Sequence, residues 1–293
     1  MTIESRATLK QWVAGARPRT LPAAIVPVVV GTIAVRPYEV HESRALLALI
    51  VALALQIGTN FANDYSDGIR GTDQRRVGPV RLVGQGLASP NAVRWAAMAS
   101  FLVAMVAGLI ICSMTTYWLL PFGAAAVLAG WLYTGGPRPY GYLGLGEVFV
   151  FVFFGLLATV GSSYIEMLSI PTVVWPAAVT VGLMATILLE ANNLRDITGD
   201  TVSGKRTIAV RLGRVRAGYF VVVLCVGVAA GIALVTLWRP WAAVAFLGLG
   251  PLVPLCRLAL SHAQGPELLA MLPAAARAQL LVGALLAVGL ANA

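Results

Sequence analysis

Charged residues are scarce in this chain. They make up 11% of its 293 residues, whereas 59% of the residues are apolar. Soluble domains devote roughly a quarter of their residues to charge, so this chain has too little charge to cover a water-exposed surface. We therefore expect an integral membrane protein.

Metal-binding and redox residues are scarce as well. Cys112, Cys225 and Cys256 lie in or beside apolar runs without a CxxC spacing, so neither a disulfide framework nor a zinc site is indicated. His41 and His262 stand far apart in connecting segments, and we assign them no role. A Walker A sequence is absent, so nucleotide hydrolysis is not indicated.

The net charge of +9 does not indicate a nucleic-acid partner. The Lys and Arg residues fall between apolar runs and form no single patch, so membrane topology explains them better. Eighteen of the 21 lie in connections on the side of the N-terminus, and only Arg36, Arg44 and Arg239 lie on the other side. This bias predicts a multi-pass protein of the cytoplasmic (inner) membrane with a cytoplasmic N-terminus.

Apolar runs long enough to cross a bilayer recur along the whole chain, and a backbone in lipid must form helices. The first run could be mistaken for a signal-peptide core, but the many runs that follow favour a transmembrane helix. The sequence predicts an all-α protein with about nine transmembrane helices, at 18–35, 44–63, 92–112, 116–133, 145–165, 172–192, 217–237, 241–260 and 273–292.

Two polar clusters close the second and sixth of these runs. In each, an Asn precedes an Asp by four residues, a spacing that places both side chains on one face of a helix. The clusters comprise Asn60, Asn63, Asp64, Asp67 and Asp73 in the first, and Asn192, Asn193, Asp196 and Asp200 in the second.

The clusters indicate an internal repeat. Asp64 and Asp196 are 132 residues and four spans apart, so the chain divides into two four-helix units and a ninth helix. An even number of intervening spans gives both units one orientation, related by an axis along the membrane normal. The clusters then face each other across a central cavity on the cytoplasmic side.

Carboxylate and carboxamide oxygens of this kind favour Mg²⁺. A single Asp beyond a span is more commonly a solvated loop charge. Here, however, the clusters are paired, and Asn residues within apolar helices are costly and usually functional. The pattern therefore predicts a shared cation site.

Basic residues follow both clusters and suit a diphosphate beside the cation. Arg195 and Lys205 follow the second cluster, and Arg138 stands in the third cytoplasmic loop. The positive-inside rule is the alternative explanation for the basic residues that follow the clusters. Among the aromatics, Tyr140 is the candidate to face a carbocation. Glu147 and Glu190 are open to two interpretations, as proton acceptors or as polar anchors.

Four segments carry a resemblance to a known family: 16–24, 63–68, 133–147 and 192–213. With these segments the chain resembles the intramembrane aromatic prenyltransferase superfamily, whose members bind a prenyl diphosphate through Mg²⁺ held by two Asp-rich motifs. The resemblance covers essentially the whole chain and implies one transmembrane prenyltransferase domain over residues 1–293.

The resemblance implies a role for each candidate residue. The implied metal ligands are Asp64, Asp67, Asp73, Asp196 and Asp200. The implied substrate-binding residues are Asn60, Asn63, Asn192, Asn193, Arg138, Tyr140 and Arg195, and the implied catalytic residues are Asp64, Asp67, Asp196, Asp200 and Lys205. One departure concerns position 71, where the superfamily has an Asp and this chain has Gly71, so that Asp73 is the substitute after a two-residue shift.

Within the superfamily, segment 133–147 is most similar to the branch that serves menaquinone synthesis. That resemblance implies transfer of a polyprenyl group from its diphosphate to 1,4-dihydroxy-2-naphthoate, with loss of CO₂ to give demethylmenaquinol. Other acceptors, namely 4-hydroxybenzoate, homogentisate or haem, remain alternatives. A CDP-alcohol phosphotransferase and a non-catalytic transporter are the alternatives from other classes.

Overall fold

A computed structural model of the chain describes residues 7–72 and 80–292. These residues form helices and connections and contain no strand, which confirms the all-α prediction. The α-helices are α1 (Leu9–Gly15), α2 (Pro22–Ile33), α3 (Glu42–Ile69), α4 (Pro90–Met114), α5 (Leu120–Leu132), α6 (Gly146–Val150), α7 (Ala158–Met167), α8 (Val174–Val202), α9 (Ile208–Thr236), α10 (Leu252–Leu260) and α11 (Met271–Ala291). Shorter 3₁₀ or π segments are η1 (Pro18–Thr20), η2 (Tyr117–Leu119), η3 (Tyr140–Leu143), η4 (Phe151–Leu157), η5 (Pro240–Leu249) and η6 (Gly265–Ala270).

Each of the nine predicted spans falls on one helix or on two or three consecutive helical segments. Six spans in the described chain are long and apolar enough to cross a membrane alone, and two bent pairs raise that number to at most eight. The remaining apolar helix, Tyr117–Leu132, is shorter than the others. A multi-pass membrane protein is therefore supported, and the count of nine stays a prediction.

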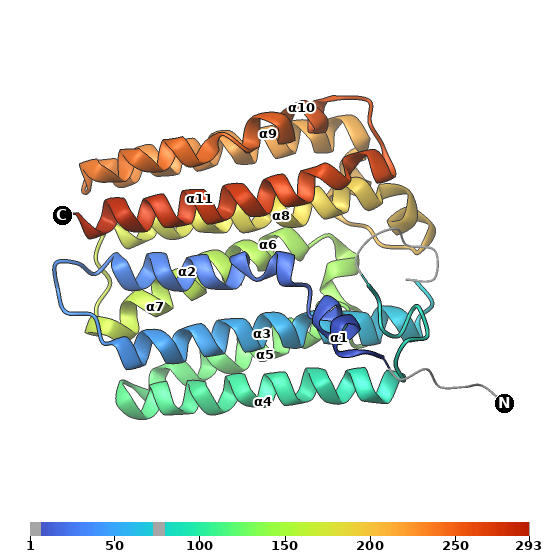
Figure 1. The fold of residues 1–293 in the computed structure, drawn as a ribbon, viewed down its shortest axis with the longest axis horizontal. Helices are drawn as coiled ribbons and strands as arrows, with labels where there is room; N and C mark the ends of the chain where they lie inside the picture. The colour runs from blue at the N-terminus through green and yellow to red at the C-terminus, as the bar shows by residue number, and fades with distance from the viewer. Residues whose placement is uncertain (1–6, 73–79, 293) are drawn as a thin grey trace.

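The helices lie side by side in one bundle (Figure 1). Helices α3 and α8 run in the same direction and end at the same end of the bundle, near α1. The C-terminal end of α11 lies at the opposite end. The parallel sense of α3 and α8 agrees with the predicted repeat and places the two polar clusters at one end.

Both of these helices are longer than their apolar runs. Helix α3 continues six residues past the predicted end at 63, and α8 continues ten residues past 192. The hydropathy of the sequence drops at the first Asn, but the backbone keeps its helical hydrogen bonds because neighbouring segments satisfy the polar side chains. The clusters are thus part of the helices and not of loops.

Close helix packing depends on glycine where η4 crosses α8. A Cβ atom on Gly155 would lie 2.3 Å from the Cα of Gly182, and backbone atoms cannot yield as a flexible side chain can. Small residues allow such close approach between helices in membranes.

We expect Gly155→Ala to destabilise the protein by about 1–3 kcal/mol through overpacking. Gly161→Ala is the matched control, because a Cβ on Gly161 meets nothing within 4 Å and alanine favours a helix over glycine. Thermal unfolding of the two variants in detergent measures the difference. A midpoint for Gly155→Ala at or above that of Gly161→Ala would contradict this packing argument.

Candidate active site

The two polar clusters are buried, which overturns the alternative of solvated loop charges. Asp64 and Asp67 on α3 are 1% and 2% exposed, and Asp196 and Asp200 on α8 are also buried. Buried carboxylates are costly unless they are paired, hydrogen-bonded or bound to a cation. Their surroundings therefore decide what the site can hold.

The clusters border one large cavity of about 1180 Å³. Its polar end is lined by Asn60, Asn63, Asp67, Asn192, Asn193, Arg195, Asp200 and Lys205, together with Arg17, Arg81 and Tyr142. Its remaining length is apolar and includes Val28, Val51, Ile111, Leu157 and Ile165. Pockets for single drug-sized ligands measure about 300–1,000 Å³, so this cavity has room for a long apolar chain beside a second molecule.

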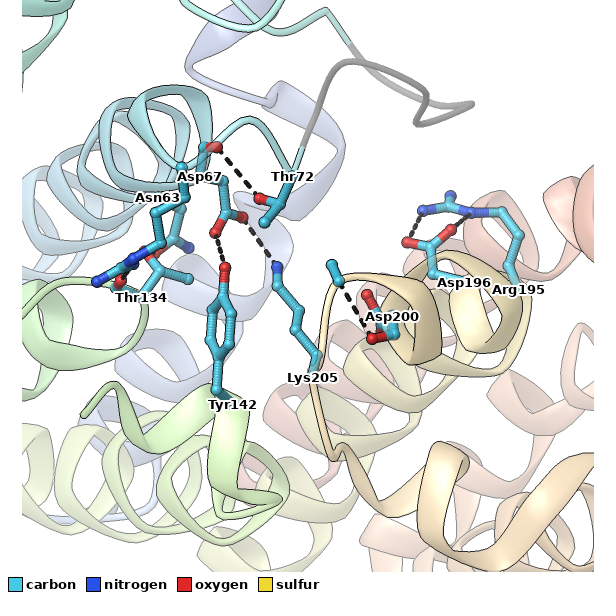
Figure 2. Close-up of polar contacts among 11 residues, drawn as sticks. Asn63, Asp67, Thr72, Thr134, Tyr142, Arg195, Asp196, Asp200 and Lys205 are labelled. Atoms are coloured by element: carbon cyan, nitrogen blue, oxygen red, sulfur yellow. Dashed lines mark hydrogen bonds and ion pairs between the residues drawn. The ribbon is translucent and has the colours of Figure 1, made fainter. Parts of the chain in front are cut away.

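Asp67 joins three segments at the polar end (Figure 2). One carboxylate oxygen, Oδ2, lies 3.0 Å from Nζ of Lys205, and the other, Oδ1, accepts a hydrogen bond from the Tyr142 hydroxyl at 2.9 Å. The Lys205 Nζ also lies 4.7 Å from the centroid of the Tyr142 ring. The end of α3, the turn at 140–143 and the loop after α8 therefore meet at one carboxylate.

Tyr142 acts here as a hydrogen-bond donor. Burial raises the pKa of its phenol above the usual value, and the nearby charge of Asp67 raises it further. The phenol consequently stays protonated beyond about pH 10, where an unperturbed tyrosine ionises. Arg70 lies 5.5 Å from the same ring and donates to the backbone oxygens of Thr134 and Gly136.

We expect Tyr142→Phe to lower turnover about tenfold to a hundredfold, because a hydrogen bond to a charged group is lost. Since the raised pKa keeps the phenol protonated as pH rises, the wild type and the variant should have pH–rate profiles of the same shape up to about pH 10. Steady-state rates between pH 6 and 10 test this. An alkaline loss of activity below pH 10 that disappears in Tyr142→Phe would contradict the assignment.

Asp64 does not line the cavity. Its Oδ2 accepts a hydrogen bond from the backbone N–H of Leu82 at 2.7 Å, and its Oδ1 accepts one from Val83 at 3.1 Å. The carboxylate therefore fixes the segment that carries Arg81, which does line the cavity. The predicted metal role of Asp64 stays a prediction.

In the second cluster, Arg195 and Asp196 form a bidentate pair, with Nε–Oδ1 and Nη2–Oδ2 distances of 2.7 Å each. Arg195 lines the cavity, whereas Asp196 does not. Asp200 lines it, and its backbone oxygen accepts a hydrogen bond from the N–H of Lys205 at 2.8 Å. This turn after α8 directs Lys205 back toward Asp67, as Figure 2 shows.

Three of the four asparagines connect their helices to neighbouring segments. Asn60 donates to the backbone oxygen of Ala16 at 2.9 Å, and Asn63 accepts from the Thr134 hydroxyl at 2.8 Å. Asn192 donates to the Leu188 carbonyl of its own helix at 3.0 Å. Asn193 donates to the Glu147 carboxylate at 2.7 Å. All four asparagines border the cavity.

The remaining candidates differ in position. Arg138 is exposed and does not line the cavity, so its predicted contact with diphosphate has no support from its placement. Tyr140 lines the cavity and stacks on Phe149, with ring centroids 3.9 Å apart, and Phe149 stacks on Phe153. Asp73 lies outside the described residues.

Several residues that line the cavity are not among the candidates that the sequence singles out. Arg17 precedes the bend into α2 with a left-handed backbone, φ 54°, and lines the cavity with Arg81. Tyr142 lies in segment 133–147, but its place in the site follows from its contact with Asp67. On α3 the available signal is the recurrence of polar side chains at positions 56, 60, 63 and 67, the spacing of one helical face.

The donor set at the polar end suits Mg²⁺ together with a diphosphate. Within residues 7–72 and 80–292, no three His, Cys, Asp or Glu side chains converge to hold an ion alone. Magnesium in phosphate sites needs only one or two carboxylates, because water and phosphate oxygens complete its octahedron. Asp67 and Asp200 would hold it, and Lys205, Arg17 and Arg81 supply the positive charge that a diphosphate requires.

A helical membrane bundle around one cavity, charged at one end and apolar beyond it, defines an intramembrane site for an amphiphilic substrate. The chain belongs to the UbiA prenyltransferase family, which it matches over residues 24–273. This membership confirms the expectation of a membrane-bound prenyltransferase. It leaves no support for the phosphotransferase and transporter alternatives.

Individual relatives agree with this assignment. The 1,4-dihydroxy-2-naphthoate octaprenyltransferase of Mycobacterium leprae is 46% identical over 89% of this chain and 90% of its own length. The enzyme of the same name from Mycobacterium tuberculosis is 53% identical over 72% of each chain.

Solved structures share the fold. The structure of a UbiA homolog from Archaeoglobus fulgidus bound to GPP and Mg²⁺ has a TM-score of 0.67 at 17% identity, covering 94% of this chain and 99% of that one. A UbiA homolog from Aeropyrum pernix has a TM-score of 0.68 at 16% identity, covering 92% and 95%. At these identities the likeness shows the fold alone.

Proposed function

We propose that the chain transfers the prenyl group of an allylic polyprenyl diphosphate to 1,4-dihydroxy-2-naphthoate. The observation that carries the proposal is the large cavity, whose charged end suits a diphosphate and whose apolar length suits a polyprenyl chain. The choice of acceptor is supported by relatives 36–53% identical to this chain that bear the name 1,4-dihydroxy-2-naphthoate octaprenyltransferase.

At the polar end, Lys205, Arg17 and Arg81 bind the diphosphate oxygens, and the buried position of Lys205 keeps its charge poorly screened by water. Asp67 and Asp200 would hold Mg²⁺, which would supply Lewis-acid chemistry that makes the diphosphate a better leaving group. Tyr142 and Lys205 hold the Asp67 carboxylate in place, which limits its reorganisation during the reaction.

The allylic C–O bond then ionises, and the diphosphate remains with the basic residues. The rings of Tyr140, Phe149 and Phe153 line the cavity beyond, where they exclude water and present aromatic faces to the allylic cation. The acceptor ring is electron-rich, and its own carboxylate-bearing carbon attacks this cation. Loss of CO₂ restores the aromatic ring and gives demethylmenaquinol, so no base is required at that carbon.

We place the polar end at the cytoplasmic face of the inner membrane. The positive-inside bias supports this orientation, since the Lys and Arg residues concentrate in the connections at that end. The diphosphate is then drawn from the aqueous side, while the polyprenyl tail remains in the apolar part of the bundle.

Membranes containing the chain test the proposal directly. They are supplied with Mg²⁺ and labelled polyprenyl diphosphate, together with either 1,4-dihydroxy-2-naphthoate or 4-hydroxybenzoate. We expect a prenylated product that has lost CO₂ with the first acceptor and no product with the second. Turnover of 4-hydroxybenzoate alone would move the chain to another branch of the family, and failure with both would remove the proposed acceptor class.

A further inference from the structure

Two buried carboxyl groups lie against each other beside the cavity, and the chemistry described above does not use them. Glu147 on α6 is 3% exposed and Glu190 on α8 is fully buried. The carboxyl of Glu147 is the polar neighbour of Glu190, and within the described chain neither oxygen of Glu190 meets a hydrogen-bond donor. Among the described residues, the hydrogen-bond donor that this pair meets is Asn193.

The pair reaches the cavity through Asn193. The Nδ2 of Asn193 donates to Oε1 of Glu147 at 2.7 Å in a buried hydrogen bond, and Asn193 lines the cavity. A carboxylate oxygen can only accept, so this contact fixes the amide group with its nitrogen toward Glu147. The carbonyl oxygen, Oδ1, is left as the acceptor that Asn193 can offer to a ligand.

Asn63, on α3 of the first unit, uses its other amide atom for its protein contact. Its Oδ1 accepts from the Thr134 hydroxyl, so its Nδ2 is the group left for a ligand. The two asparagines border the same cavity with different hydrogen-bonding groups. A diphosphate has only acceptor oxygens and suits the Asn63 amide nitrogen, whereas the Asn193 carbonyl oxygen requires a donor.

The surroundings of Asn193 suit a flat aromatic donor. Phe149 lies two residues after Glu147 on the same short helix, and it forms a stacked series with Tyr140 and Phe153. All three rings line the cavity that Asn193 borders. A stacked wall beside a hydrogen-bond acceptor is complementary to an aromatic ring that bears a hydroxyl group.

We propose that Asn193 binds a hydroxyl group of the aromatic acceptor through Oδ1, and that Glu147, held by Glu190, is the positioning residue that orients the amide. The inference rests on the proposed function, which it deepens by giving the acceptor a subsite apart from the diphosphate. Glu190 contacts Glu147 and not Asn193, so it affects the amide only through Glu147.

The experiment measures binding and turnover by the full chain in nanodiscs. The ligands are 1,4-dihydroxy-2-naphthoate and its two monohydroxy analogues, 1-hydroxy- and 4-hydroxy-2-naphthoate. Asn193→Ala and Glu147→Leu should raise the Kd and KM for the dihydroxy acceptor about tenfold, the effect of one lost hydrogen bond. The KM for the polyprenyl diphosphate should stay within about twofold of the wild type, because the diphosphate does not use this oxygen.

Two further comparisons separate positioning from general structural support. In the wild type, the analogue that lacks the hydroxyl bound by Asn193 should bind about tenfold more weakly, and this penalty should vanish in Asn193→Ala. Glu147→Gln keeps an acceptor oxygen and should restore normal binding. Gln279→Leu is the control for loss of a buried polar side chain, since Gln279 is fully buried on α11 and does not line the cavity.

If Glu147 acts only through Asn193, the double variant Glu147→Leu/Asn193→Ala should bind the acceptor no more weakly than Asn193→Ala alone. Unchanged acceptor affinity in Asn193→Ala, with normal binding by the wild type, overturns this inference and leaves the proposed function intact. A wild type that neither binds nor prenylates any of these naphthoates overturns both.

Discussion

Replacing Asp67 with asparagine should lower prenyl transfer about 10²–10³-fold while the protein still inserts and folds. The Asp67 carboxylate lines the cavity, contacts Lys205 at 3.0 Å and accepts a hydrogen bond from Tyr142. Asparagine keeps the size and one acceptor oxygen but removes the charge, so that Lys205 loses its ion partner and a bound cation loses a ligand. A loss of this size is typical when one preorganised electrostatic group is removed.

Glu39→Gln is the matched control for Asp67→Asn. It makes the same chemical change on an exposed acid in the connection between α2 and α3, at the opposite end of the bundle. Single-turnover rates with saturating substrates and Mg²⁺ compare the two variants, and size-exclusion chromatography checks their folding. An Asp67→Asn rate within threefold of Glu39→Gln would remove Asp67 from the catalytic centre.

Much of the fold follows from the sequence because the bilayer restricts it. Apolar runs of about 20 residues must be helices, and their number fixes which connections share a side. The common end of α3 and α8 follows from the even number of runs between the clusters. The break between η1 and α2 does not follow, since the bend after Arg17 depends on contacts of Asn60 with Ala16 and Thr20 that are distant in sequence.

The sequence predicts which helices carry the polar clusters, but it does not predict which of their side chains face the cavity. Asn60 and Asp64 share a helix face by spacing, yet Asn60, Asn63 and Asp67 line the cavity and Asp64 holds the backbone of Leu82 and Val83. Each residue turns a helix by about 100°, so a small rotation of α3 decides which carboxylate faces inward. Asp64 is bound by the segment at 80–84, whose position no local pattern encodes.

The same limit applies to the basic residues. Lys205 and Arg138 are equally plausible diphosphate ligands by sequence, since Lys205 follows the second cluster and Arg138 stands in a loop on the same side. The turn that closes α8 directs Lys205 inward, where it is buried against Asp67, whereas Arg138 lies between two prolines and is exposed. The structure thus separates two residues that the sequence treats alike, and this separation can be measured.

Lys205→Gln should lower kcat/KM for the polyprenyl diphosphate about a hundredfold. The charge lost is buried, where its attraction for a diphosphate is worth several times its value in water, and Asp67 is left without its ion partner.

Arg138→Gln, the same loss of charge on an exposed side chain, should stay within about threefold, as expected of a solvated pair. Raising the salt concentration should weaken the small effect of Arg138 and leave that of Lys205 largely unchanged, because buried charges are poorly screened. Kinetics with varied diphosphate at two ionic strengths distinguish the residues, and equal losses in both variants would show that Arg138 moves into the site when substrate binds.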